Sequence, residues 1–339
     1  MKHFCLLLTF TILFSACDSQ PKEKGLGEKQ TYDTLNLALD WRPNVLHSGI
    51  FYAQAKGWYR DSGLVLNWFT PEVDNYTVKP IKKLLAGQAD LSVGPSEHLF
   101  HYGVDSGGVK AQAVASLLQN DRSAFVVKAS ADIKRPADFS GRRYLGYQTP
   151  LEQEILAGMI ADDGGDPQFE TTTPGRLSLW EAFQQDSGDI AWVFLHWEAM
   201  KAQIEGVELR SFIPSNYGVP YGYSSVIMAR KEMDETLAKN VKDFLAISGR
   251  AYQALRDSAG STEIVRAFVD HPNFKDSVFI AQAQANISPH YFNQQGKWGT
   301  MRTSVWADYL AWLREQNMPD YKVMEAIPAT AFYTNRFLE

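Results

Sequence analysis

The most restrictive feature of this sequence is a repeated alternation of strand-like and helix-like segments between residues 34 and 118. In the first segment three leucines, at 35, 37 and 39, alternate with Asn36 and Ala38, and this period of two is typical of a short strand. Strands that alternate with helices are joined by crossovers, which favour a parallel, doubly wound sheet. The expected strands are 35–39, 64–69, 90–93 and 112–117, and the expected helices are 50–56, 78–86 and 96–102.

A second set of elements follows a turn marked by Pro136 and Gly141. Its run IAWVFL at 190–195 is apolar on both faces, which is typical of a strand buried between two helix layers. Short β-branched runs at 123–128 and 224–229 are expected to carry the chain into this second lobe and back. We therefore predict an α/β fold of two lobes with a hinge of two crossing strands. The expected bounds are 34–124 for the first lobe, 125–227 for the second, and 228–339 for a mainly helical return to the first.

Composition and motifs exclude several functional classes. With 339 residues, 45% of them hydrophobic, the chain is long enough for two globular domains. Its formal net charge of -6 argues against a nucleic-acid partner. The sequence holds no glycine-rich dinucleotide loop, Walker loop, zinc-protease motif or nucleophile elbow, so we expect no cofactor and no catalysis. His98 and His101 form the one close histidine pair, which we interpret as surface residues rather than a metal site.

The N-terminal segment has the features of an export signal. Lys2 precedes an apolar run at 4–14 that is too short to span a bilayer. The run ends in Phe-Ser-Ala-Cys at 14–17, which resembles the bacterial lipobox, although Phe14 replaces the usual leucine. We predict a signal peptide at 1–16, a lipid on Cys17 and a polar tether at 17–33, which would anchor the protein to a bacterial membrane facing the periplasm or exterior. A plain secretory signal is the alternative.

The segment after the first strand carries the densest group of candidate binding residues. Trp41, Asn44 and His47 fall between strand and helix, at the carboxyl end of a strand where open α/β sheets bind ligands. Together they could stack on a ring and hydrogen-bond its edges. The alternative is a capped loop with Trp41 in the core.

Two further candidates lie in the second lobe. At 146–154, Thr149, Pro150 and Glu152 occupy the N-cap, N1 and N3 positions of a capping box. The functional alternative makes Tyr147 a stacking wall and Glu152 an acceptor for a donor-rich ligand. Trp197 either forms a buried apolar stripe with Met200 and Ile204 of the helix that it begins, or faces a cleft at the end of the buried strand. A turn at 94–98 offers backbone amides to an anion, but Glu97 would repel it.

These residues also carry a resemblance to a known family. The blocks DWRPNVLHSGIFYAQAKGWYRDSGL, GYQTPLEQE with DDGGDP, and DIAWVFLHW resemble three blocks of the thiamine-pyrimidine precursor family. That family includes periplasmic proteins that bind formylaminopyrimidine for an ABC importer and a fungal enzyme that makes hydroxymethylpyrimidine. Leu46 and Tyr147 depart from its asparagine and tryptophan. The resemblance implies a type II periplasmic-binding-protein fold with Trp41, Asn44, His47, Tyr147, Glu152 and Trp197 on the ligand.

The resemblance further implies a monomeric solute-binding lipoprotein that delivers a small aromatic heterocycle to an ABC permease and its ATPase. The enzyme branch uses a cysteine cluster, whereas this chain has only Cys5 and Cys17. The alternative is a protein that binds another small solute, such as a flavin, a sulfonate or nitrate, or a ligand-sensing receptor. A pyrimidine synthase is the third possible function.

The anchor prediction is tested by metabolic labelling with a fatty-acid analogue. Labelling should mark the wild type and be lost in Cys17→Ser, because the thioether-linked lipid needs that sulfur. Equal labelling of the two proteins would rule out acylation at Cys17.

Overall fold

The computed structural model describes residues 32–339 except 148, 176–177, 258–259 and 317–326. The predicted signal peptide, Cys17 and nearly all of the tether lie outside the described residues. Within the described part, no helix is long and apolar enough to cross a bilayer.

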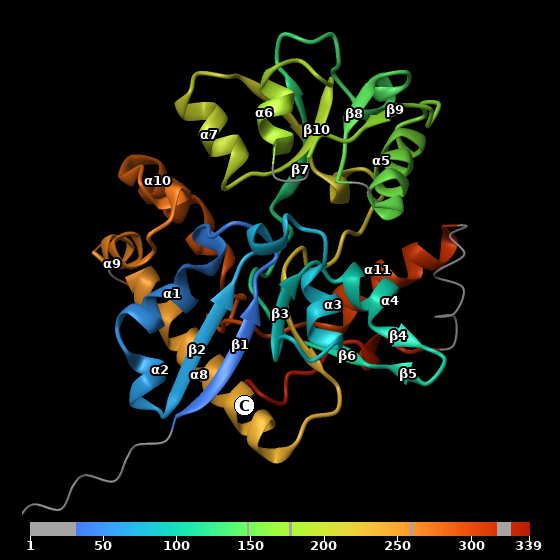
Figure 1. The fold of residues 1–339 in the computed structure, drawn as a ribbon. Coiled ribbons are helices and arrows are strands. Elements are labelled where there is room, and N and C mark those ends of the chain that lie inside the picture. The colour runs from blue at the N-terminus through green and yellow to red at the C-terminus, as the bar shows by residue number, and fades with distance from the viewer. Residues whose placement is uncertain (1–31, 148, 176–177, 258–259, 317–326) are drawn as a thin grey trace, which may run out of the picture. The chain divides into compact units, whose positions relative to one another are not determined.

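The first sheet has five strands in the order β2-β1-β3-β12-β6 (Figure 1). β1 runs parallel to β2 and β3, whereas β12 is antiparallel to both β3 and β6. The four strands expected at 35–39, 64–69, 90–93 and 112–117 run in the same direction, which confirms the parallel arrangement predicted for them. β12 enters this sheet from the other lobe and runs in the opposite direction. The bounds are β1 Asp33–Ala38, β2 Leu64–Phe69, β3 Leu91–Gly94, β6 Ala111–Ser116 and β12 Val226–Arg230.

The second sheet also has five strands, in the order β11-β7-β10-β8-β9. β10 lies at its centre, parallel to β8 and antiparallel to β7, so the prediction of a buried central strand at 190–195 is confirmed. The bounds are β7 Ser123–Lys128, β8 Arg143–Leu145, β9 Glu170–Thr172, β10 Ile190–Phe194 and β11 Leu209–Phe212, and a separate hairpin joins β4 Val104–Asp105 to β5 Gly108–Val109.

Two segments connect the sheets, and they define the two lobes of the predicted α/β fold (Figure 1). The chain leaves β6 and enters the second sheet at β7, then returns from β11 to the first sheet at β12. The crossings are residues 117–122 and 213–225. The expected run at 123–128 forms β7 of the second sheet, whereas the run at 224–229 ends the second crossing and then forms most of β12.

Helices cover both sheets. In Figure 1, α5, α6 and α7 flank the second sheet, whereas α1, α3, α8 and α11 flank the first. The bounds are α1 Ser48–Ala55, α2 Trp58–Asp61, α3 Pro80–Leu85, α4 Glu97–Tyr102, α5 Pro150–Asp162, α6 Leu179–Gln184, α7 Glu198–Ile204, α8 Glu235–Asp257, α9 Ser261–Phe268, α10 Ser277–Ile287 and α11 Thr303–Glu315. Short 3-10 helices are η1 Val45–His47, η2 Pro71–Asp74, η3 Pro136–Phe139, η5 Pro214–Asn216, η6 Pro272–Phe274, η7 Ser288–His290 and η9 Ala329–Ala331.

The C-terminal helices hold the loop that follows β1. The apolar stripe of α8 is buried against α1, and its Tyr252 hydroxyl donates to the Leu46 carbonyl at 2.7 Å. Tyr291 donates in the same way to the Val45 carbonyl at 2.7 Å. Gly49 leaves room for the Tyr252 ring, since a Cβ at that position would lie 2.3 Å from it. This packing fixes the backbone from which Asp40, Trp41 and Arg42 project.

Candidate ligand-binding site

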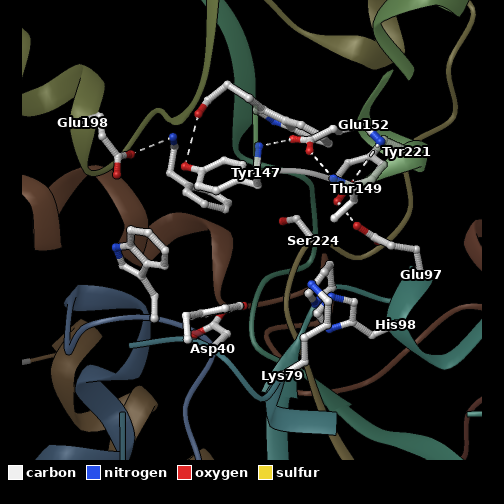
Figure 2. A pocket seen from close by; sticks show the side chains of 15 residues that line it. Asp40, Lys79, Glu97, His98, Tyr147, Thr149, Glu152, Glu198, Tyr221 and Ser224 are labelled. Atoms are coloured by element: carbon white, nitrogen blue, oxygen red, sulfur yellow. Dashed lines mark hydrogen bonds between the residues drawn. The ribbon is translucent and has the colours of Figure 1, made fainter. Parts of the chain in front are cut away.

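A cavity of about 130 Å³ lies where residues from both lobes meet, and we call it the first cavity (Figure 2). Its walls combine aromatic rings with acidic side chains. The aromatic residues are Trp41, Tyr76, Tyr147, Trp192, Phe194 and Tyr221, the acidic residues are Asp40, Glu97, Glu152 and Glu198, and the others are Lys79, Pro95, His98, Thr149 and Ser224.

Trp41 and Tyr147 close this cavity from opposite lobes. Their rings meet edge to face with centroids 5.9 Å apart and planes at 88°. Trp41 follows β1 of the first sheet and Tyr147 follows β8 of the second. The structure therefore brings together two residues that the sequence placed in separate ligand-binding blocks, and both offer a ring to the cavity.

His47 lies behind the cavity rather than in its wall. Its side chain is 0% exposed, and its Nε2 lies 3.0 Å from Asp40 Oδ1. The Ser225 hydroxyl donates to the other oxygen, Asp40 Oδ2, at 3.3 Å. Asp40 is a lining residue, so His47 acts on the cavity by holding the Asp40 carboxylate in place.

Asn44 also lies outside the lining of the first cavity. It is buried, its Oδ1 accepts from the Leu46 amide at 2.8 Å, and its Nδ2 donates to the Arg42 carbonyl at 3.2 Å. Both polar ends of this side chain are thus used on the loop backbone. Asn44 caps η1 and shapes the loop that presents Trp41, which matches the alternative of a capped loop.

Glu152 combines the two roles that the sequence left open. The predicted capping box is confirmed: the Thr149 amide donates to Glu152 Oε1 at 2.5 Å, and the Glu152 amide donates to Thr149 Oγ1 at 3.3 Å. The Tyr144 hydroxyl and the Tyr147 amide both donate to Oε2, at 3.0 and 2.8 Å. The carboxylate nevertheless lines the cavity, so it fixes Tyr147 and contributes negative charge there.

Trp197 packs between the lobes. Its ring meets Phe279 of α10 edge to face, with centroids 4.6 Å apart. It does not line the first cavity but lines a neighbouring cavity of about 70 Å³. The stripe expected along α7 buries Met200 but leaves Ile204 43% exposed.

Glu97 is a cavity residue that sequence reasoning ranked low. The Tyr221 hydroxyl donates to its Oε1 at 2.9 Å. Its Oε2 is buried and has no hydrogen-bond partner among the described residues. Burial raises the pKa of Glu97 to about 7. The sequence analysis considered the backbone amides of the turn at 94–98 as an anion site. In the structure it is the Glu97 side chain of this turn that lines the cavity.

Glu198 was not predicted at all. It opens α7, is buried, and accepts a hydrogen bond from the Phe194 amide at 2.9 Å. Burial raises the pKa of Glu198 to about 7. The available signal was its position directly after a buried strand and next to Trp197.

The cavity as a whole suits a flat ligand that donates hydrogen bonds. Aromatic faces stack on rings, and carboxylate oxygens accept from amino or ring N–H groups. Among the described lining residues four carboxyl groups face the single ammonium group of Lys79, so the cavity favours a hydrogen-bond donor over an anion. No cluster of three or more metal-ligating side chains occurs in the part of the chain that the structure describes.

Comparison with known proteins gives a consistent result. The family described as NMT1/THI5 like matches residues 44–258. A formylaminopyrimidine-binding protein of Halalkalibacterium halodurans is 22% identical over 319 residues, covering 92% of this chain and 94% of the relative. A putative thiamine biosynthesis protein of Haemophilus influenzae is 24% identical over 281 residues, covering 82% and 86%.

Solved structures share the fold. The alkanesulfonate-binding protein SsuA of Xanthomonas axonopodis pv. citri, bound to MOPS, superposes with a TM-score of 0.65 at 13% identity, over 90% of this chain and 99% of that one. The predicted periplasmic-binding-protein fold is thereby confirmed.

The capping network predicts that Glu152→Gln destabilises the unliganded protein by about 1–3 kcal/mol, because the amide loses the charge and one acceptor that serve three donors. Chemical denaturation measures this free energy of unfolding. Glu154→Gln, the same change in the same helix, should stay within about 0.5 kcal/mol of wild type. Equal stability of Glu152→Gln and wild type would contradict the network.

The raised pKa of Glu97 predicts a pH-dependent stability difference. In the unfolded chain a glutamate has its ordinary pKa of about 4.3, so the folded state holds the proton more tightly. The stability this confers is complete below about pH 4 and is lost as the pH rises through about 7. Glu97→Gln should therefore gain stability relative to wild type between about pH 5 and pH 8, by roughly 1.4 kcal/mol per unit of pKa difference.

Denaturation curves at several pH values give this difference. Glu232→Gln, at an exposed position, removes the same charge outside the cavity and should show a flat difference. A flat difference for Glu97→Gln as well would show that burial does not perturb this carboxyl.

Proposed function

The chain belongs to the NMT1/THI5-like family, and on that premise we propose that it is an extracytoplasmic solute-binding protein of an ABC importer. Its ligand is a small aromatic heterocycle, with a thiamine pyrimidine precursor, formylaminopyrimidine or hydroxymethylpyrimidine, as the leading candidate. The permease and its ATPase are the partners, and a lipid on Cys17 holds the protein at the membrane as a monomer. The relative named as a formylaminopyrimidine-binding protein, matched along nearly its whole length, supports this role.

The observation that carries the proposal is the unpaired oxygen of Glu97 in an aromatic cavity. A buried acceptor without a partner costs free energy, which a ligand N–H would recover. An aminopyrimidine has N–H donors on its edge and a flat face that Trp41 or Tyr147 can stack on. Glu97 therefore accepts a hydrogen bond from the edge of the ring, while the aromatic residues stack on its face.

A sulfonate is the second candidate, because sulfonate-binding proteins share the fold. Charge argues against it in the first cavity. A sulfonate would lie among Asp40, Glu97, Glu152 and Glu198 and would present acceptors to acceptors. The acidic lining thus favours a neutral or cationic ring over an anionic head group.

Isothermal titration with hydroxymethylpyrimidine, formylaminopyrimidine and ethanesulfonate tests the proposal. At least one pyrimidine should bind and ethanesulfonate should not. Glu97→Gln should weaken pyrimidine binding by about 1.5–3 kcal/mol, the range for a hydrogen bond to a charged group. Glu232→Gln is the matched control and should bind as wild type does.

Three outcomes would contradict the proposal. If neither pyrimidine binds, or if ethanesulfonate binds more tightly than both, the ligand class is wrong. If Glu97→Gln binds the pyrimidine as tightly as wild type, Glu97 makes no hydrogen bond to the ring.

A further inference from the structure

A second cavity of about 70 Å³ adjoins the first, and the two share Trp41, Tyr147 and Glu198 in their walls. Trp41 and Tyr147 stand at the junction, where their rings meet edge to face. A ring in the first cavity therefore lies beside the second cavity, across the contact between Trp41 and Tyr147.

The second cavity differs from the first in having two cationic side chains in its wall. Arg42 and Lys201 line it, and neither lines the first cavity. Trp180 lines it too, and this residue is only 6% exposed. The Trp180 indole N–H is buried without a hydrogen-bond partner among the described residues. An acceptor on a ligand in this cavity would satisfy that donor.

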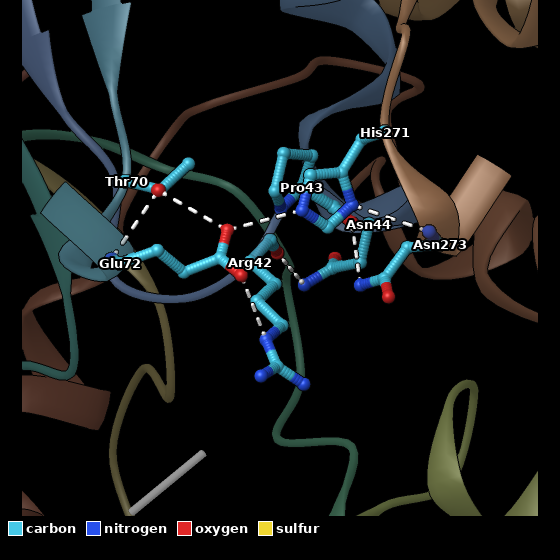
Figure 3. Close-up of polar contacts among 7 residues, drawn as sticks. All are labelled: Arg42, Pro43, Asn44, Thr70, Glu72, His271 and Asn273. Carbon is cyan, nitrogen blue, oxygen red and sulfur yellow. Dashed lines mark hydrogen bonds and ion pairs between the residues drawn. The ribbon is translucent and has the colours of Figure 1, made fainter. Parts of the chain in front are cut away.

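Arg42 is oriented for this task by a network outside the cavity (Figure 3). Its Nε donates to Glu72 Oε1 at 3.1 Å, while Glu72 Oε2 lies 3.0 Å from His271 Nε2 and accepts from Thr70 Oγ1 at 3.3 Å. Figure 3 shows the two terminal nitrogens of Arg42 directed away from Glu72. Holding the guanidinium through Nε leaves its terminal N–H groups for a carboxylate or phosphate.

The acidic residues of the second cavity do not cancel these donors. Glu181 is exposed, so solvent and salt screen its charge. Glu198 already accepts from the Phe194 amide through one oxygen. Within the described part of the chain, the ion pair of Lys201 is a long one, 3.9 Å to Glu205, which leaves its ammonium available to a ligand.

We propose that the second cavity is a subsite for an acidic group, a carboxylate or a phosphate, carried by the same ligand whose ring occupies the first cavity. The inference rests on the function proposed above and narrows it. The ligand class becomes an amino-substituted heterocycle with an acidic substituent, its ring read by Glu97 and its acid by Arg42 and Lys201. An acid placed directly in the first cavity gains nothing from these cations.

A matched set of probes separates the ring from the acid. Titration calorimetry compares hydroxymethylpyrimidine, its phosphate ester, and the analogue with a carboxymethyl group in place of hydroxymethyl. At least one acidic probe should bind wild type about tenfold more tightly than the alcohol, as expected for charge-assisted hydrogen bonds. Arg42→Gln and Lys201→Gln should each remove most of that gain and leave the alcohol's affinity within about twofold.

Lys242→Gln removes an exposed positive charge outside both cavities and should leave all three affinities unchanged. If the alcohol binds but neither acid binds more tightly, the subsite is wrong and the proposed function stands. The subsite is also wrong if Arg42→Gln and Lys201→Gln weaken acid binding no more than Lys242→Gln. If neither the alcohol nor an acid binds, the proposed function and the subsite both fall.

Discussion

Two tyrosine hydroxyls that donate to the carbonyls of Val45 and Leu46 hold the part of the structure on which both cavities depend. Tyr252 and Tyr291 come from the C-terminal third of the chain, while the loop they hold follows the first strand. Because these carbonyls are buried, losing a donor would leave an acceptor unpaired at a cost of about 1–3 kcal/mol. The loop is therefore rigid at its base, and Asp40, Trp41 and Arg42 project from a fixed backbone.

The first cavity holds several acidic groups away from water. Removing a carboxylate from water disfavours its charged form, which is why burial raises the pKa of Glu97 and of Glu198 to about 7. The Tyr221 hydroxyl donates to Glu97, and the Phe194 amide donates to Glu198. The carboxyl oxygens can accept further hydrogen bonds from a ligand. Burying them therefore costs free energy in the unliganded protein, and a ligand rich in N–H donors would recover it.

Residues that matched family blocks divide into those that line the first cavity and those that support it. Trp41, Tyr147 and Glu152 are in the wall. His47 orients Asp40 from behind, and Asn44 caps the loop that carries Trp41. Trp197 joins the lobes through Phe279 and lines the second cavity instead. The family blocks therefore identified the region of the first cavity. Some of the side chains that line this cavity, such as Glu97 and Glu198, lie outside or next to the residues that matched.

Features that depend on local periodicity could be predicted from the residues alone. The alternation of strands and helices, the capping box at Thr149 and Glu152, the buried stripe of α8 and the two-sided apolar strand β10 are all encoded by residues within a few positions of each other. Such patterns report which face of an element is buried, and that information is local.

Which polar groups share a cavity became clear only from the folded chain. Tyr221 and Glu97 are 124 residues apart, and they meet because the returning chain passes the first turn of α4. Likewise Arg42, Glu72 and His271 come from three separate segments and meet in one network. The antiparallel entry of β12 is set by the path between lobes and leaves no mark on its own sequence. Contacts between distant segments arise from packing, so local sequence patterns cannot specify them.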